Sequence, residues 1–117
     1  KNIVHYSDFV IYHLLDCASK EQLLVFYKNT VKNLCDYDDE NNSNLIATLE
    51  AYFNNTGNIT EASKEIFVHR NTFMYRLDKI KSILNSDLKD SEELLEIQLG
   101  IKAMHLLNNS YSFDILN

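Results

Sequence analysis

The sequence contains no proline and only two glycines, Gly57 and Gly100. These two residue types usually punctuate β-hairpins and the turns of β-sandwiches, so their scarcity argues against an all-β fold. Hydrophobic residues make up 45% of the 117 positions, which is enough to bury one core but not two independent ones. We therefore predict a single all-α fold, a compact bundle of about six helices.

Long apolar runs and cysteine clusters are missing as well. No stretch approaches the roughly 20 apolar residues that a membrane-spanning helix needs, and no signal-peptide pattern opens the chain. Cys17 and Cys35 stand alone without a CxxC pair, which excludes the usual zinc sites and a disulfide framework. We expect reduced thiols in a cytoplasmic protein that has no membrane partner.

Residue sets that would support catalysis or metal binding are not found in the sequence. His13 and Cys17 are four residues apart on a predicted helix, but their neighbourhood offers no third and fourth metal ligand. The acidic run 36–42 does not fit a calcium loop, because Asn41 stands where the loop needs glycine and Ala47 where it needs glutamate. There is also no Ser-His-Asp set and no glycine-rich phosphate loop. The sequence predicts no enzyme activity, no metal and no cofactor.

Positive charge is scarce and concentrated in one segment. The net charge of −6 argues against a protein that coats nucleic acid indiscriminately, because neutralising phosphates requires positive charge. Residues 58–84 hold five basic and three acidic residues, a net charge of +2, which leaves −8 for the rest of the chain. Both arginines of the sequence, Arg70 and Arg76, lie in this segment. One basic segment therefore stands out in an acidic protein.

Apolar residues with helical spacing divide the chain into six predicted helices. We expect the acidic run 36–42 to be a solvated loop between the second and third helices, with Ser43 or Asn44 capping the third. The predicted helices cover approximately residues 8–18, 19–35, 44–53, 60–67, 70–84 and 91–107.

Capping patterns support several of these boundaries. Ser19 with Gln22, and Asp90 with Glu93, match the capping box, in which two residues three apart satisfy each other's free backbone N–H groups. Gly57 suits the left-handed position just past the end of the third helix.

The predicted helices also suggest a domain organisation. Residues 1–42 are predicted to form an N-terminal helical pair leading from a missing upstream domain, and residues 43–117 a helix-turn-helix domain packed with it as one unit. The run from Ile3 to Tyr6 looks like the tail of a strand from that upstream domain. Because the first residue is not methionine, we expect the chain to be cut from a longer protein.

The segment 60–84 has the form of a helix-turn-helix. Thr60 is expected to open the first helix and His69 to cap the second, with the small residues Ala62 and Ser63 where the helices cross. At helical spacing, the inner stripe of the second helix consists of Phe73, Leu77, Ile80 and Leu84. Outward Asn, Thr, Tyr, Lys and Arg side chains are the types that reach base edges and phosphates. The predicted DNA-binding residues are His69, Arg70, Asn71, Thr72, Tyr75, Arg76 and Lys79.

The last predicted helix carries two separate apolar faces. One face contains Ile97 and Ile101, and the other is formed by Leu95, Leu99, Ala103 and Leu106. The second face could contact a dimer partner, or both faces could be buried within one chain. A helical protein-protein interaction or dimerisation module without DNA binding is accordingly the alternative to a DNA-binding domain.

The residue string of the motif favours the DNA-binding domain over the interaction module. The string from Val68 to Leu77, VHRNTFMYRL, resembles the V-H-R-N-T-L-x-Y-R-L signature of the C-terminal DNA-binding domain of PucR-type transcription regulators. The similarity extends to the T-L-x-A-Y-L helix of that family, here Thr48 to Phe53, and covers roughly residues 36–107. Phe73 replaces the usual leucine, and Met74 occupies a variable position that is often basic in relatives.

This resemblance implies a helix-turn-helix of the kind found in the nucleoid protein Fis, with His69, Arg70, Asn71, Thr72, Tyr75 and Arg76 matching the family string. It also implies a homodimer on double-stranded promoter DNA. A small-molecule effector would act only through the missing upstream domain. With Met74 and Asp78 on the rim of the second helix, and a net charge of −8 around it, we expect a lone monomer to bind DNA weakly.

Overall fold

The computed structural model describes the backbone of residues 6–116 and the side chains of residues 10–108. This part of the chain folds into helices and contains no strand, which confirms the predicted all-α fold. Its seven helices are α1 (Tyr6–Asp16), α2 (Lys20–Thr30), α3 (Lys32–Asn41), α4 (Leu45–Asn54), α5 (Ile59–Glu65), α6 (Arg70–Leu84) and α7 (Ser91–Leu116).

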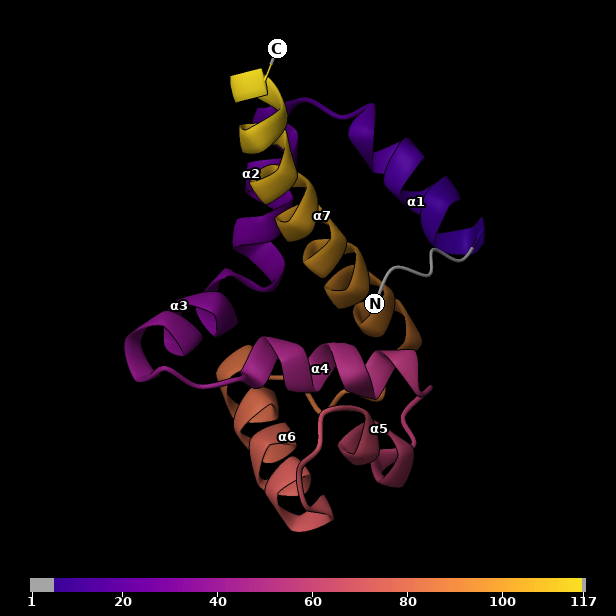
Figure 1. The fold of residues 1–117 in the computed structure, drawn as a ribbon, viewed down its shortest axis with the longest axis vertical. Coiled ribbons are helices and arrows are strands. Elements are labelled where there is room, and N and C mark those ends of the chain that lie inside the picture. Colours follow the sequence, from indigo (N-terminus) through magenta and orange to yellow (C-terminus); the bar gives the residue numbers. More distant parts are fainter. Residues whose placement is uncertain (1–5, 117) are drawn as a thin grey trace.

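The helices are arranged around α4 (Figure 1). On one side of α4 lie α5 and α6, both of which contact it. On the other side, α2 and α7 pair with each other, and α1 packs against α7. The α5–α6 pair and the C-terminal end of α7 therefore lie at opposite ends of a molecule that measures 44 × 28 × 28 Å.

One hydrophobic core joins the two sides. Phe73 of α6 and Leu49 of α4 are fully buried in the same cluster as Val31 and Leu34, which come from the N-terminal third of the chain. Ile97 and Ile101 of α7 complete this cluster from the other side. The N-terminal helices thus share a core with the helix-turn-helix.

The predicted second helix is in fact two helices, and the predicted acidic loop is helical. At Val31 the backbone leaves the helical region (φ −118°, ψ 2°), and this fully buried residue forms the bend between α2 and α3. The acidic run then continues as α3 up to Asn42, which adopts a left-handed conformation (φ 50°). The helix is amphipathic: Leu34 is fully buried, whereas Asp39 and Glu40 are exposed. The prediction failed because the charges on the outer face concealed the inward-facing residues.

The acidic segment also caps α4. The Asp38 carboxylate accepts hydrogen bonds from the backbone N–H groups of Leu45 and Ile46, both at 2.9 Å, and from the Ser43 hydroxyl at 2.6 Å. Asn44 occupies the N-cap position but makes no side-chain capping bond. The predicted cap from Ser43 or Asn44 is thus replaced by a carboxylate from the preceding helix.

Other helix ends agree with the predictions in part. Ser19 and Gln22 form the complete capping box, and Gly57 is left-handed (φ 83°) as predicted. At α7, the Asp90 carboxylate accepts from the Glu93 N–H at 2.9 Å, but Glu93 binds the Ser86 hydroxyl instead of completing the box.

Several helix boundaries were predicted wrongly, including both ends of α1, which spans Tyr6–Asp16 and not residues 8–18. The α5 helix begins at Ile59, one residue before Thr60, because Asn58 is its N-cap and accepts from the Glu61 N–H at 3.0 Å. The α7 helix continues to Leu116 instead of ending near residue 107. Of the predicted N-terminal strand remnant, Tyr6 is the first residue of α1, and Ile3 to His5 lie outside the described residues.

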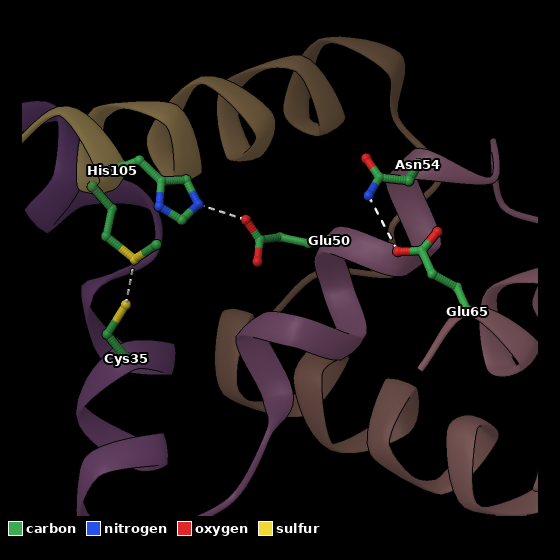
Figure 2. A network of polar contacts seen from close by, with 6 residues as sticks. Cys35, Glu50, Asn54, Glu65 and His105 are labelled. Atoms are coloured by element: carbon green, nitrogen blue, oxygen red, sulfur yellow. Dashed lines mark hydrogen bonds and ion pairs between the residues drawn. The ribbon is translucent and has the colours of Figure 1, made fainter. Parts of the chain in front are cut away.

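Side-chain contacts hold α4 between α7 and α5 (Figure 2). Glu50 of α4 pairs with His105 of α7 at 2.6 Å. Asn54, at the end of α4, donates an amide hydrogen bond to the Glu65 carboxylate of α5 at 3.3 Å. The neighbouring Asn55 donates to the same carboxylate at 3.0 Å. Both sides of the molecule are therefore tethered to the same short helix.

None of the helices within residues 6–116 combines the length and the apolarity needed to cross a membrane.

Candidate nucleic-acid interface

The turn between α5 and α6 closes with two backbone hydrogen bonds. The Phe67 N–H donates to the Lys64 carbonyl at 3.2 Å, and the Val68 N–H donates to the Ser63 carbonyl at 3.1 Å. This pairing is the Schellman motif, which satisfies the last free carbonyls of a helix through a left-handed residue. Here the left-handed residue is Phe67 (φ 58°). The motif makes the turn short and fixes the direction in which α6 leaves it.

Small side chains let α5 pack closely against its neighbours. Ala62 is fully buried in the core, and Ser63 is buried with its hydroxyl donating to the Thr60 carbonyl at 2.8 Å. Ile66 and Val68 pack against the core from the turn, as expected of the residues at the corner. Buried side chains therefore anchor both α5 and the turn that follows it in the core.

The N-terminus of α6 is capped by His69. Its ring nitrogen Nδ1 accepts a hydrogen bond from the Asn71 N–H at 2.9 Å. Accepting this bond leaves Nε2 as the proton-bearing nitrogen of a neutral ring. The predicted cap is confirmed, and it places the exposed imidazole at the free end of the helix.

Burial divides α6 into the two predicted faces. Phe73, Leu77 and Ile80 are buried, and Leu84 is half-buried against the core. On the other face, Tyr75 is 73% exposed. The exposed side chains among the predicted DNA-binding residues are His69, Arg70, Asn71, Thr72 and Tyr75, and the half-buried ones are Arg76 and Lys79.

The two half-buried cations differ in their surroundings. The Lys79 ammonium lies 5.2 Å from the centroid of the Tyr37 ring of α3, within the range of a cation–π contact. Arg76 makes no ion pair or hydrogen bond with any side chain that the structure describes. Lys79 is therefore held beside α3 at the edge of the exposed face of α6, and Arg76 lies at the flank of that face.

Sequence reasoning missed the contribution of α3. Tyr37 belongs to the run that was predicted to be a solvated loop, and it lies 42 positions before Lys79 in the sequence. No local spacing relates the two residues, because their proximity depends on how α3 packs against α6. A helical period through the acidic run would have been the only available signal.

Two other basic side chains at this end of the molecule, Lys64 and Arg70, already contact neighbouring side chains. The Lys64 ammonium lies 3.6 Å from the Glu61 carboxylate on the exposed face of α5. The Arg70 guanidinium contacts the sulfur of Met74, one turn further along α6, at 3.5 Å. The exposed face of α6 thus carries few cations, together with polar and apolar side chains.

The residues predicted for a dimer interface are spread over different environments. Leu95 is 53% exposed, Leu99 and Leu106 are half-buried, and Ala103 is fully buried within the chain. Lys102, which lies on the same face of α7, has its ammonium 5.0 Å from the Tyr12 ring of α1. Part of this face is therefore covered by α1 in the same chain, and Leu95 is the member left open.

Comparison with known proteins gives a coherent set of similarities. Residues 45–103 match the PucR C-terminal helix-turn-helix domain family. The chain is 35% identical over 95 residues to the purine catabolism regulatory protein of Bacillus subtilis, and 34% identical over 107 residues to the DNA-binding transcriptional activator AdeR of the same organism. It is also 33% identical over 63 residues to the carbohydrate diacid regulator of Escherichia coli.

These matches cover most of this chain but little of the relatives. The alignments include 81%, 91% and 54% of this chain, and 18%, 25% and 16% of the three relatives in the same order. The chain therefore spans at most about a quarter of the curated relatives that it matches. No solved structure gives a significant match.

Proposed function

Because the chain belongs to the PucR C-terminal helix-turn-helix domain family, we propose that it is the sequence-specific DNA-binding output domain of a transcription regulator. The family match includes α4, α5 and α6 entirely, and the relatives' names describe transcription regulators and activators.

The observation that carries this proposal is the exposed face of α6. His69, Asn71, Thr72 and Tyr75 are exposed to solvent on or just before α6. The α5–α6 pair lies at the end of the molecule opposite the C-terminal end of α7 (Figure 1). In a helix-turn-helix, the N-terminal residues of the second helix reach the base edges in the major groove. Asparagine pairs with adenine in two hydrogen bonds, and threonine contacts bases or phosphates, so the side chains offer the required chemistry.

The two arginines are assigned to the DNA backbone. Arg70 and Arg76 flank the outward face of α6, and each can neutralise one phosphate. Lys79 is a third candidate, which Tyr37 holds at the rim. Because these are few cations for a DNA-binding surface, we expect modest affinity for one copy of the chain.

A homodimer would supply the missing affinity. Dimeric helix-turn-helix proteins bind two half-sites about one helical turn apart, and two-fold symmetry in the protein matches the symmetry of the site. We assign the contact to the outward part of the α7 face, where Leu95 is open and Leu99 and Leu106 are half-buried. We assign control by a small-molecule effector to segments outside this chain. We place the regulator in the cytoplasm.

The test is fluorescence anisotropy of labelled duplex DNA over a range of salt concentrations. Duplexes enriched from a randomised library should bind wild type with an affinity that falls with salt. The double variant Arg70→Ala/Arg76→Ala should bind more weakly and reduce the magnitude of the salt slope by about 2 per bound protomer.

The matched control removes two exposed lysines at other sites, Lys28 and Lys89. The Lys28→Ala/Lys89→Ala variant has the same net charge as the double arginine variant and should retain most of the wild-type affinity and salt slope. Equal loss in both double variants would mean that net charge, and not the α6 surface, drives binding. Wild-type affinity in the double arginine variant would refute the assignment of α6 as recognition helix.

A further inference from the structure

The turn of the helix-turn-helix contains a phenylalanine at a backbone position that favours glycine. Phe67 is the left-handed residue of the Schellman motif that ends α5. Glycine predominates at this position because a Cβ atom clashes with the neighbouring carbonyl there. The turn would therefore form more easily with glycine than with phenylalanine.

The side chain of Phe67 gives no packing in return. It is 93% exposed, the most exposed of the large hydrophobic side chains that the structure describes. Leu88 has a similar backbone (φ 57°) but is buried in the core, so its side chain offsets the strain. Asn42 and Asn85 belong to the residue type that tolerates this conformation best after glycine. Thr56 is also left-handed (φ 49°) and exposed, and its hydroxyl donates a hydrogen bond to the Asn55 carbonyl.

Phe67 is not the only apolar side chain exposed at this end. Met74 is 39% exposed and Tyr75 is 73% exposed on the first two turns of α6. The other exposed large hydrophobic residues in the described part of the chain lie on α1, α2 and α7. The end that presents the recognition helix thus combines exposed apolar groups with few free cations.

A major groove offers one apolar feature that such groups can recognise. The C5-methyl group of thymine projects into the groove and is read by apolar contact, whereas the other base edges are read by hydrogen bonds. Phe67 lies two residues before His69, the cap of α6, so it is next to the helix end that enters the groove.

Building on the proposed function, we propose that Phe67 is a specificity-determining residue whose ring packs on thymine methyl groups at the edge of the site read by α6. The ring is exposed in the free protein because its partner is the DNA. The strained turn is retained because glycine would lose this contact.

The experiment separates the backbone role of residue 67 from its contact with DNA. The probe is a duplex enriched by the wild-type 117-residue chain from a randomised library long enough for two half-sites. Each thymine of this duplex is replaced in turn by deoxyuridine, which removes only the methyl group. Binding is measured by anisotropy, and stability by urea unfolding.

The variant Phe67→Gly should unfold at the same or a higher urea concentration than wild type, and it should bind the duplex about tenfold more weakly. For wild type, deoxyuridine at one or two positions should weaken binding several-fold. For Phe67→Gly, the same replacements should have no effect, because the ring that contacts the methyl group is missing.

The control variant is Asn85→Gly, which places glycine at the left-handed position ending α6, at the opposite end of that helix. It should leave both binding and deoxyuridine sensitivity unchanged.

If Phe67→Gly binds as tightly as wild type and keeps the same deoxyuridine sensitivity, the inference is overturned. The exposed ring would then be a contact for a protein partner and not for DNA. A loss that is equal for all duplexes, without any thymine dependence, would overturn thymine recognition. A sharply lower unfolding midpoint for Phe67→Gly would overturn the account of the strained turn. Failure of every duplex to bind wild type at low salt would overturn the proposed function, and this inference with it.

Discussion

Gly100 of α7 lies directly against Thr30 of α2. A Cβ atom built on Gly100 would be 2.0 Å from Thr30 Oγ1 and 2.6 Å from Thr30 Cβ, both far inside contact distance. Thr30 is held in place because its hydroxyl donates to the Phe26 carbonyl at 2.8 Å. The absence of a side chain at position 100 therefore permits α2 and α7 to pair, and this pairing forms the half of the molecule away from the helix-turn-helix.

The substitution Gly100→Ala should destabilise the protein, although alanine is the better helix former. Alanine gains about 1 kcal/mol of helix propensity over glycine, but the clash with the Thr30 side chain forces the two helices apart. Overpacking of this kind typically costs about 1–3 kcal/mol. Urea unfolding measures the net change, and a comparison of Glu96→Gly with Glu96→Ala, at an exposed position of α7, measures the propensity difference without the clash. A Gly100→Ala variant more stable than wild type would show that α2 adjusts freely.

Removing the Asp38 carboxylate should loosen α4, on which both halves of the molecule depend. The carboxylate bonds two backbone N–H groups and the Ser43 hydroxyl, and loss of a helix cap costs about 1–2 kcal/mol. We expect Asp38→Ala to show this loss and Asp38→Asn to show less of it, because the amide oxygen can still accept. Asp39→Ala, at the neighbouring exposed position, should be close to neutral. Equal unfolding midpoints for Asp38→Ala and Asp39→Ala would contradict the capping role.

The two cysteines should differ in reactivity. Cys17 is exposed, whereas burial raises the pKa of the Cys35 thiol above its ordinary value. The thiolate is the reactive form, and Cys35 also lies against the Met104 sulfur at 3.2 Å. At pH 8, iodoacetamide should therefore alkylate Cys17 at least about tenfold faster than Cys35. Peptide mass spectrometry follows both sites, and in urea the difference should vanish. Equal rates in the folded protein would mean that the α3–α7 contact opens readily.

The raised pKa of the Cys35 thiol also makes the stability of the protein depend on pH. The folded protein holds this proton more tightly than the unfolded chain, so its stability should be constant below the unfolded thiol pKa of about 8.5 and fall as the pH rises beyond it. Unfolding at pH 7, 8, 9 and 10 tests this. A Cys35→Ala variant should show a shallower alkaline decline than wild type, and an identical decline would assign it to other groups.

The proposed dimer can be tested at Leu95, the open member of the predicted α7 face. Sedimentation of wild type should show dimers at concentrations of tens of micromolar, and Leu95→Glu should shift the equilibrium towards monomer. Val25→Glu places the same charge at another exposed apolar position, on α2, and should leave association unchanged. A wild-type protein that stays monomeric on its own and on a two-half-site duplex would rule out pairing through this chain.

Much of the site could be predicted because its signals are local. Helical spacing alone separates the buried Phe73, Leu77 and Ile80 from the exposed Asn71, Thr72 and Tyr75, and the structure confirms this division. The His69 cap depends on residues two positions apart, so it too can be read from the sequence. The binding roles of these side chains remain predictions.

The acidic run 36–42 shows where local reading fails. Its charges suggested a loop, yet the segment is mainly helical and supplies both the Asp38 cap of α4 and the Tyr37 ring beside Lys79. Each contact joins residues from different helices, and sequence spacing carries no information about such pairs. The same holds for Glu50 with His105, which are 55 positions apart.

The sequence by itself thus determined the all-α class, the helix-turn-helix and the two faces of α6, because these follow from periodicity, capping and turn chemistry within a few residues. Only the tertiary structure decided that α3 packs against α6 and places Tyr37 beside Lys79, that α4 is tethered to both α7 and α5, and that α1 covers part of the second α7 face. These features depend on which helix surfaces meet. Packing selects among many surfaces of similar apolarity, so the choice is fixed by the shape of the whole core and by close approaches such as that of Gly100 to Thr30.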